Sequence, residues 1–144
     1  MLVGLSVRDV VLIDRLDLSF ESGLSVLTGE TGAGKSILLD ALGLALGNRA
    51  DAGLLRPGAK QASVAAVFEV EPGHPARAIL DEREIEAEDG LLVLRRLLGA
   101  DGRSRAFVKP LRSSSSQTFP GVGSASRSIG TSSFAAERRS RSIW

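Results

Sequence analysis

Apolar and polar positions along the first third of the chain divide it into three strand-like runs and one helix-like run. Residues 2–7 (LVGLSV) form an apolar run, and residues 16–20 (LDLSF) alternate with the period of two that is typical of a half-buried strand. Residues 24–28 (LSVLT) are almost continuously apolar, and residues 37–46 (ILLDALGLAL) have the length and spacing of a helix. The pattern predicts two strands, a third strand, and then a helix.

The middle of the chain predicts further strands. Residues 63–70 (SVAAVFEV) read as a strand that ends at a segment rich in proline and glycine, and residues 76–83 follow as a short helix. Residues 91–98 and 103–108 read as the two arms of a β-hairpin, because a turn sequence, GADG at 99–102, separates them. We therefore expect an antiparallel group of strands beside the helix at 37–46.

The connecting segments carry few candidates for chemistry. Gly47 is a natural stop for the helix, and residues 48–60 form a loop with three cations that either contacts a ligand or, as we favour, is solvated. The acidic residues 82–89 predict a solvated face or loop. His74 is the single histidine, and its position between two prolines and a glycine indicates an exposed loop residue rather than a catalytic base.

Composition changes abruptly near residue 109. The chain has 144 residues and 15.1 kDa, which is room for one domain, but its last quarter is dominated by serine, arginine and glycine, with four serines at 113–116. The apolar residues after 110 follow neither period two nor period 3.6, so no face can be buried. We predict a folded unit at residues 1–108 and a disordered tail at 109–144.

Charge separates the same two parts. The net charge is +1, but residues 1–110 hold 13 Lys and Arg against 16 Asp and Glu, whereas residues 111–144 hold five Arg against one Glu. A flexible DNA-binding arm is the alternative interpretation of that tail. There is no cysteine, no N-terminal signal pattern, and no apolar run near the ~18 residues that a membrane helix needs, so we expect a soluble cytoplasmic protein without membrane contact.

The strongest motif is GETGAGKS at residues 29–36, which fits the P-loop pattern G-x-x-x-x-G-K-[ST] without a mismatch. Such a pattern also occurs by chance in proteins that bind no nucleotide, but here a strand-like run precedes it and a helix-like run follows it, as a P-loop requires. The predicted ligand-binding residues are Gly29, Glu30, Thr31, Gly32, Ala33, Gly34, Lys35 and Ser36. We name no catalytic residue.

The residue types fit the chemistry of a bound nucleoside triphosphate. Backbone N–H groups must wrap the phosphates, and glycines are placed where a Cβ would block that approach or a positive φ is needed. Lys35 can reach the β- and γ-phosphates, the Ser36 hydroxyl can be a Mg²⁺ ligand, and the following helix directs its positive dipole end at the phosphates. The expected cofactors are ATP and Mg²⁺.

A longer block around the motif resembles the N-terminal ATPase head of the RecN family of bacterial DNA repair proteins. The resemblance rests on GETGAGKSILLDALGLALGNRAD, on LRPGA at 55–59 and on DGRSRAFV at 101–108. It implies an α/β fold, namely the N-terminal lobe of an ABC- or SMC-like P-loop head with mixed strands around the P-loop helix. It also implies recombinational repair of DNA double-strand breaks, with ATP driving head–head dimerisation and DNA as a partner of the complete protein.

The chain departs from the family pattern after residue 108. The HGQ stretch of the family is missing, Gln117 has the wrong setting to replace it, and no Walker B run, ABC signature or coiled coil follows. Since hydrolysis needs such groups, the enzyme assignment is left open, and a truncated or frameshifted fragment that binds ATP is the leading interpretation. A small stand-alone P-loop kinase or GTPase and a non-functional remnant are the alternatives.

Overall fold

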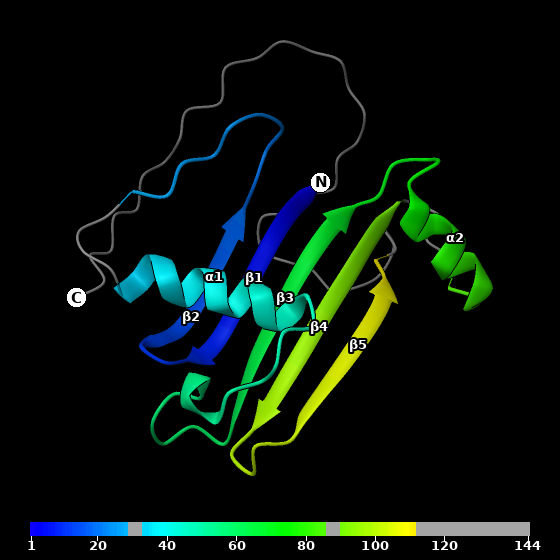
Figure 1. Ribbon diagram of the computed structural model, residues 1–144. Helices are drawn as coiled ribbons and strands as arrows, with labels where there is room; N and C mark the ends of the chain where they lie inside the picture. The colour runs from blue at the N-terminus through cyan, green and yellow to red at the C-terminus, as the bar shows by residue number, and fades with distance from the viewer. Residues whose placement is uncertain (29–32, 86–89, 112–144) are drawn as a thin grey trace.

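The computed structural model describes residues 1–28, 33–85 and 90–111, and these residues form one five-stranded sheet with helices (Figure 1). The strands are β1 (Leu2–Val10), β2 (Ile13–Ser19), β3 (Gln61–Glu69), β4 (Leu91–Gly99) and β5 (Ser104–Pro110). Their order across the sheet is β2-β1-β3-β4-β5, and every described pair is antiparallel. The predicted strands at 2–7, 16–20, 63–70, 91–98 and 103–108 are confirmed, with slightly different ends.

Helix α1 (Ala33–Ala45) lies across one face of this sheet, over β1 and β3 (Figure 1). Its side chains at spacings of four and three, Ile37, Ala41 and Leu44, are buried against the sheet. The sheet contributes buried residues from β1, β3 and β4 to the same cluster: Leu5, Val7, Val10, Ala62, Val64, Ala66 and Leu98. The main core therefore lies between α1 and one face of the sheet.

The end of α1 is fixed by backbone geometry, as the sequence predicts. Gly47 has φ +108°, a conformation that a residue with a Cβ rarely adopts. This turn lets the Asn48 N–H donate to the Gly43 carbonyl at 2.9 Å and the Gly47 N–H donate to the Leu44 carbonyl at 3.3 Å. The two bonds satisfy carbonyls that the helix itself cannot pair, so the chain leaves α1 in one defined direction.

The loop after α1 is held to the sheet rather than simply solvated. It contains a short 3-10 helix, η1 (Ala52–Leu54), and Leu55 forms an isolated antiparallel bridge with Val10. The Arg56 N–H donates to the Asp9 carbonyl at 3.0 Å, and the Arg56 guanidinium contacts the carboxylates of Asp14 at 2.5 Å and Asp9 at 3.7 Å. One of the three loop cations thus joins the loop to the β1–β2 turn, which corrects the expectation of a solvated loop.

Asp17 stabilises the β1–β2 pair from the other face of the sheet. It lies opposite Ser6, and its carboxylate contacts Arg8 at 2.9 Å and Arg15 at 3.2 Å. Burial by itself raises the pKa of the Asp17 carboxyl, but hydrogen bonds from Ser6 and from the two arginines outweigh it and leave the pKa below its usual value. The charged form of Asp17 is therefore the form that the fold stabilises.

Helix α2 (Pro75–Glu82) follows β3 and lies at one end of the sheet. His74 is its N-cap: the exposed imidazole Nδ1 accepts a hydrogen bond from the Ala76 N–H at 3.1 Å. Leu80 packs with Val70 and Leu92 in a second, smaller cluster. The predicted short helix and the exposed position of His74 are confirmed, whereas part of the predicted acidic loop, residues 86–89, lies outside the described residues.

The prediction of a strand at residues 24–28 is wrong. These five residues belong to no strand or helix, and Leu24 and Val26 are 92% and 70% exposed. A continuous apolar run is the pattern of a strand that is buried on both faces and paired in parallel with its neighbours. In the described part of the chain every strand pair is antiparallel and α1 covers only one face, so this run has neither a parallel partner nor a second covering layer.

Candidate nucleotide-binding site

The described half of the P-loop forms the first turn of α1. Ala33, Gly34, Lys35 and Ser36 are the first four residues of the helix. Gly34 and Ser36 are exposed, and Lys35 is half-buried. The other four predicted ligand-binding residues, Gly29, Glu30, Thr31 and Gly32, lie outside the described residues. The predicted order of motif and helix is confirmed, although the strand expected before the motif is absent.

Packing further along α1 determines where this turn lies. Ile37, one position after Ser36, is buried in the core, and Ala41 and Leu44 continue the buried stripe. A helix anchored on three successive buried positions is fixed in both rotation and direction. Because the anchor starts at Ile37, the four residues before it project past the core at the N-terminal end of α1.

This turn offers the donors that a phosphate chain requires. The first four N–H groups of an α-helix cannot be paired within the helix, and the helix dipole places partial positive charge at the same end. Lys35 adds a full positive charge and Ser36 adds a hydroxyl. The first turn of α1 contains no acidic residue, so no negative charge there opposes a bound anion. The donor set therefore fits a Mg²⁺-bound nucleoside triphosphate.

The space in front of Gly34 is open. A Cβ added to Gly34 would meet no described atom within 4 Å, and the backbone has no positive φ there. Neither packing nor backbone conformation of the described residues therefore demands a glycine. A phosphate that approaches the backbone would demand one, because a methyl group would stand between it and the N–H donors. This is the observation that favours a ligand at the turn.

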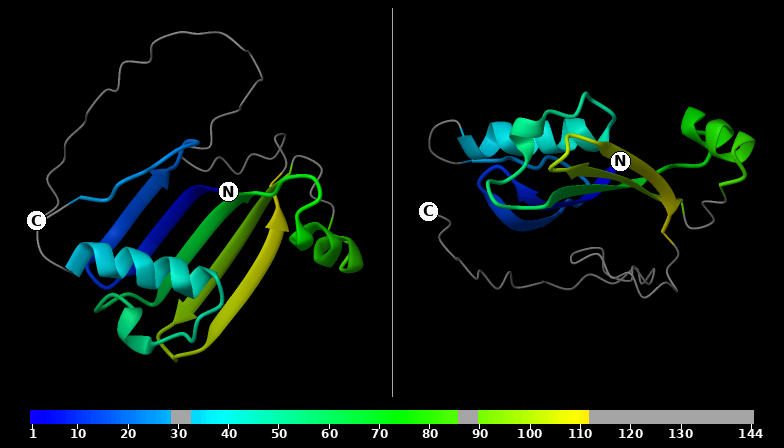
Figure 2. Two further views of the ribbon diagram at one scale, coloured as in Figure 1. Left: turned by 45° about the horizontal axis from the view of Figure 1, so that its top comes forward. Right: turned by 90° about the horizontal axis from the view of Figure 1, so that it is seen from below.

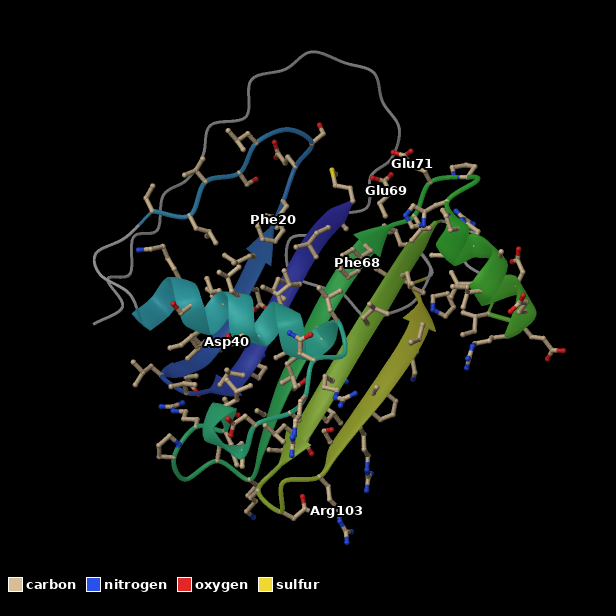
Figure 3. The ribbon with its side chains drawn as sticks, viewed as in Figure 1. Phe20, Asp40, Phe68, Glu69, Glu71 and Arg103 are labelled. Atoms are coloured by element: carbon tan, nitrogen blue, oxygen red, sulfur yellow. The ribbon has the colours of Figure 1, made fainter. Side chains whose placement is uncertain are left out.

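A separate pocket of about 410 Å³ lies between the second half of α1 and η1. Asp40, which Figure 3 labels on α1, lines it together with Leu44, Asn48, Arg49, Asp51, Gly53 and Leu54. None of the four described P-loop residues lines this pocket. Among the residues that the structure describes, no cluster of three or more His, Cys, Asp or Glu side chains could hold a metal ion.

The basic residues of the β4–β5 hairpin lie on different faces of the sheet. The β4–β5 hairpin itself is confirmed, with Gly102 at φ +73° and the Asp101 carboxylate accepting from the Arg103 N–H at 3.0 Å. Strand alternation, however, places Arg96 on the face that carries α1, where it donates to the Ser104 hydroxyl at 2.9 Å. Arg95 and Arg105 lie on the opposite face, and Arg103 lies in the turn.

Fold and motif together give the chain the fold of a partial P-loop NTPase. Comparison with solved structures agrees: a structure from work on ATP-driven dimerization and DNA-stimulated activation of SMC ATPases superposes with a TM-score of 0.57 at 22% identity, over 77% of this chain and 70% of that one. No helix in the described ranges has the length and apolarity to cross a membrane.

Sequence comparisons place the chain more narrowly. Residues 5–109 match the model of a family described as an AAA domain, and the chain belongs to that family. Its N-terminal segment is 50% identical over 104 residues to the DNA repair protein RecN of Halalkalibacterium halodurans, covering 72% of this chain and 18% of that protein. The corresponding protein of Haemophilus influenzae is 42% identical over 119 residues, covering 81% of this chain and 21% of the relative. The chain thus spans about a fifth of the length of these RecN relatives.

Proposed function

We propose that this chain binds ATP with Mg²⁺ as the N-terminal part of a RecN-like ATPase that acts in bacterial DNA repair. The open space at Gly34, within a helix turn that also holds Lys35 and Ser36, is the observation that carries the proposal. The N–H groups of residues 29–36 would surround the phosphates, Lys35 would contact the β- and γ-phosphates, and the Ser36 hydroxyl would bind Mg²⁺.

The proposal separates binding from turnover. Hydrolysis requires a second anchor for Mg²⁺ and a group that orients the attacking water, and the 144 residues hold no Walker B run that would supply them. We therefore infer that these residues bind ATP with little hydrolysis. Repair of double-strand breaks, DNA contact and ATP-driven head–head dimerisation in the bacterial cytoplasm are proposed for the complete protein. The domain proposal stays as residues 1–108 for the lobe and 109–144 for the tail, although β5 extends to Pro110.

Calorimetric titration of the whole chain with MgATP tests this proposal directly. Lys35→Ala removes the cation that the motif directs at the phosphates, so its affinity for MgATP should fall at least about tenfold, equivalent to ~1.4 kcal/mol. Lys60→Ala is the matched control, since Lys60 is an exposed lysine in the loop after η1. Equal binding by the Lys35→Ala variant would show that the P-loop assignment is wrong.

A thermal-shift measurement adds an independent readout. A ligand that binds only the native state stabilises it by about 2.7 kcal/mol when present at a hundredfold excess over its Kd. The parent chain should therefore unfold at higher temperature with MgATP than with Mg²⁺ alone, and GTP in place of ATP tests the kinase or GTPase alternative. Rapid release of inorganic phosphate by the purified chain would contradict the inference of binding without turnover.

A further inference from the structure

The sheet face opposite α1 is a surface that the nucleotide site does not use. Helix α1 and the loop with η1 lie on one side of the sheet, and no described helix covers the other side (Figure 2). We call this other side the outer face. Directly opposed residues of antiparallel strands share a face, so the strand register identifies the side chains that the outer face presents.

Three successive rows across the five strands make up the middle of the outer face. In the order β2, β1, β3, β4 and β5, the first row is Arg15, Arg8, Ser63, Leu97 and Arg105, the second is Asp17, Ser6, Ala65, Arg95 and Phe107, and the third is Ser19, Gly4, Val67, Val93 and Lys109. These rows hold five cations and a single carboxylate, that of Asp17. Ala65, Val67 and Val93, in the middle of the rows, are buried in a small apolar cluster. Beside this cluster, Arg95 and the β5 residues form an exposed part of the face.

Positive charge is concentrated in these three rows, although the folded part of the chain is acidic overall. Residues 1–110 are acidic overall, with 13 Lys and Arg against 16 Asp and Glu, yet the three rows carry a strong positive excess. Asp40 on α1 and Glu71 after β3 lie away from these rows. Glu69 follows Val67 on the outer face and adds one carboxylate beyond the third row, at the end of the sheet far from Arg103 (Figure 3). A surface that is basic while the surrounding fold is acidic attracts a polyanion specifically to that surface.

The β4–β5 half of the outer face holds the cations that are available to a ligand. Asp17 already pairs with Arg8 and Arg15 on the β1–β2 half. Arg95 is exposed, and among the described residues it donates only to the uncharged Ser63 hydroxyl, at 3.2 Å. Arg105 and Lys109 are exposed, and neither forms an ion pair with any carboxylate in the described part of the chain.

An exposed aromatic ring lies among these three cations. Phe107 is 38% exposed, it lies directly opposite Arg95, and Arg105 and Lys109 lie two residues before and after it on the same face of β5. Two residues along a strand span about 7 Å, so the two flanking cations are ~13 Å apart with the ring between them. A cationic sheet surface with a central exposed ring is an arrangement that binds single-stranded nucleic acid, whose unpaired bases stack on the ring while its phosphates contact the cations.

We propose that the outer face, through Arg95, Arg105, Phe107 and Lys109, is a docking surface for single-stranded DNA. The surface is distinct from the P-loop, on the opposite side of the sheet from α1, and its binding does not require nucleotide. A duplex would use the cations but not the ring, because its bases are already stacked. An acidic protein segment would likewise use the cations alone.

Fluorescence anisotropy of a labelled poly-dT oligonucleotide, titrated with the whole chain at several salt concentrations, tests the proposal. The parent chain should bind, with an affinity that falls as salt rises. Arg95→Gln with Arg105→Gln removes two phosphate contacts, so the slope of log K against log salt should become shallower by about 1.4. Phe107→Leu keeps an apolar side chain but removes the ring, so the affinity should fall about fivefold or more with the slope unchanged.

Two control variants separate this surface from other cations. Arg103→Gln changes an 86%-exposed arginine in the hairpin turn, outside the rows, and should leave the affinity unchanged. The triple change Arg138→Ser, Arg139→Ser and Arg141→Ser removes the arginine cluster of the tail and should leave most of the binding. Circular dichroism should give the Arg95→Gln/Arg105→Gln, Phe107→Leu and Arg103→Gln variants the thermal midpoint of the parent, because these side chains are exposed.

Several outcomes would overturn the proposal. These are failure of the parent to bind poly-dT, loss of binding in the tail variant alone, equal binding of the Phe107→Leu variant and parent, or competition by poly-glutamate as strong as that by unlabelled poly-dT. Failure of the ATP-binding proposal is a different result: Lys35→Ala should lose MgATP and keep poly-dT, whereas the outer-face variants should lose poly-dT and keep MgATP.

Discussion

Replacing Gly34 by Ala should make the protein more stable and its nucleotide binding weaker. Gly34 has a helical backbone, and an added Cβ meets nothing described within 4 Å, so the substitution introduces no clash into the free protein. Alanine at a compatible helical position reduces the conformational entropy of the unfolded chain and stabilises by about 0.4–1 kcal/mol. For a folded unit of this size that gain raises the thermal midpoint by a few degrees.

The effect on nucleotide binding has the opposite sign. The new methyl group would occupy the space through which a phosphate reaches the N–H groups of the turn, and crowding a fitted site typically costs about 1–3 kcal/mol. A loss of ~1.4 kcal/mol corresponds to tenfold weaker binding. Differential scanning fluorimetry without ligand measures the stability change, and calorimetric titration with MgATP measures the affinity.

Gly43→Ala provides a matched control in the same helix. Its added Cβ would lie 2.5 Å from Asn48 Nδ2, so Asn48 must move and the helix-propensity gain is offset, while the first turn is untouched. This variant should bind MgATP like the parent. If the Gly34→Ala variant binds MgATP as tightly as the parent, then the backbone at Gly34 does not contact phosphate and the reasoning is refuted. If it is less stable without ligand, then the described start of α1 is wrong.

Three further predictions follow from the fold. Asp17→Asn should lower the free energy of unfolding by roughly 1–2 kcal/mol at pH 7. Because the folded state lowers the pKa of Asp17, its ionised carboxylate stabilises the fold above the unfolded pKa of about 3.9, and this contribution is lost as the pH falls through the folded-state value. Urea titrations of parent and variant should therefore converge in acid, and a stability difference that stays constant with pH would contradict this. The exposed substitution Asp40→Asn serves as the control. Gly47→Ala should cost about 1–2 kcal/mol because of the positive φ, and an unchanged thermal midpoint would argue against that turn. Val26→Ser should change stability by less than about 0.5 kcal/mol, whereas fully buried Val7→Ala should cost about 2 kcal/mol; a large loss at Val26 in urea titration would restore the predicted strand at 24–28.

Local patterns predicted most of the sheet because its strands carry the information themselves. The alternation at residues 16–20 and the GADG turn at 99–102 each indicate one structure, and β2 and the β4–β5 hairpin confirm them. The same reasoning failed at residues 24–28, because a run without alternation forms a strand only when other strands lie beside it. Composition within the run does not report whether those neighbours are present.

The candidate site shows the same division between local and long-range information. The P-loop pattern located the motif at residues 29–36, since its glycines, lysine and serine are close in sequence, but the predicted helix at 37–46 began four residues later than α1 does. The contact of Arg56 with Asp9 and Asp14 joins residues more than forty positions apart, and no local pattern indicates it. Likewise, strand alternation separates Arg95 from Arg96, but only the assembled sheet determines which of the two lies on the face that packs under α1.

The exposed run at residues 24–28 has a consequence for the behaviour of the chain in concentrated solution. A short segment with β-branched and leucine residues, no charge and no proline, and without a strand partner, can pair with the same segment of another molecule. The edge strand β5 carries Arg105, Lys109 and Pro110, which oppose such pairing, but residues 24–28 contain no such protection. We therefore expect intermolecular β-pairing through residues 24–28, rather than unfolding of the sheet, to limit the solubility of this chain.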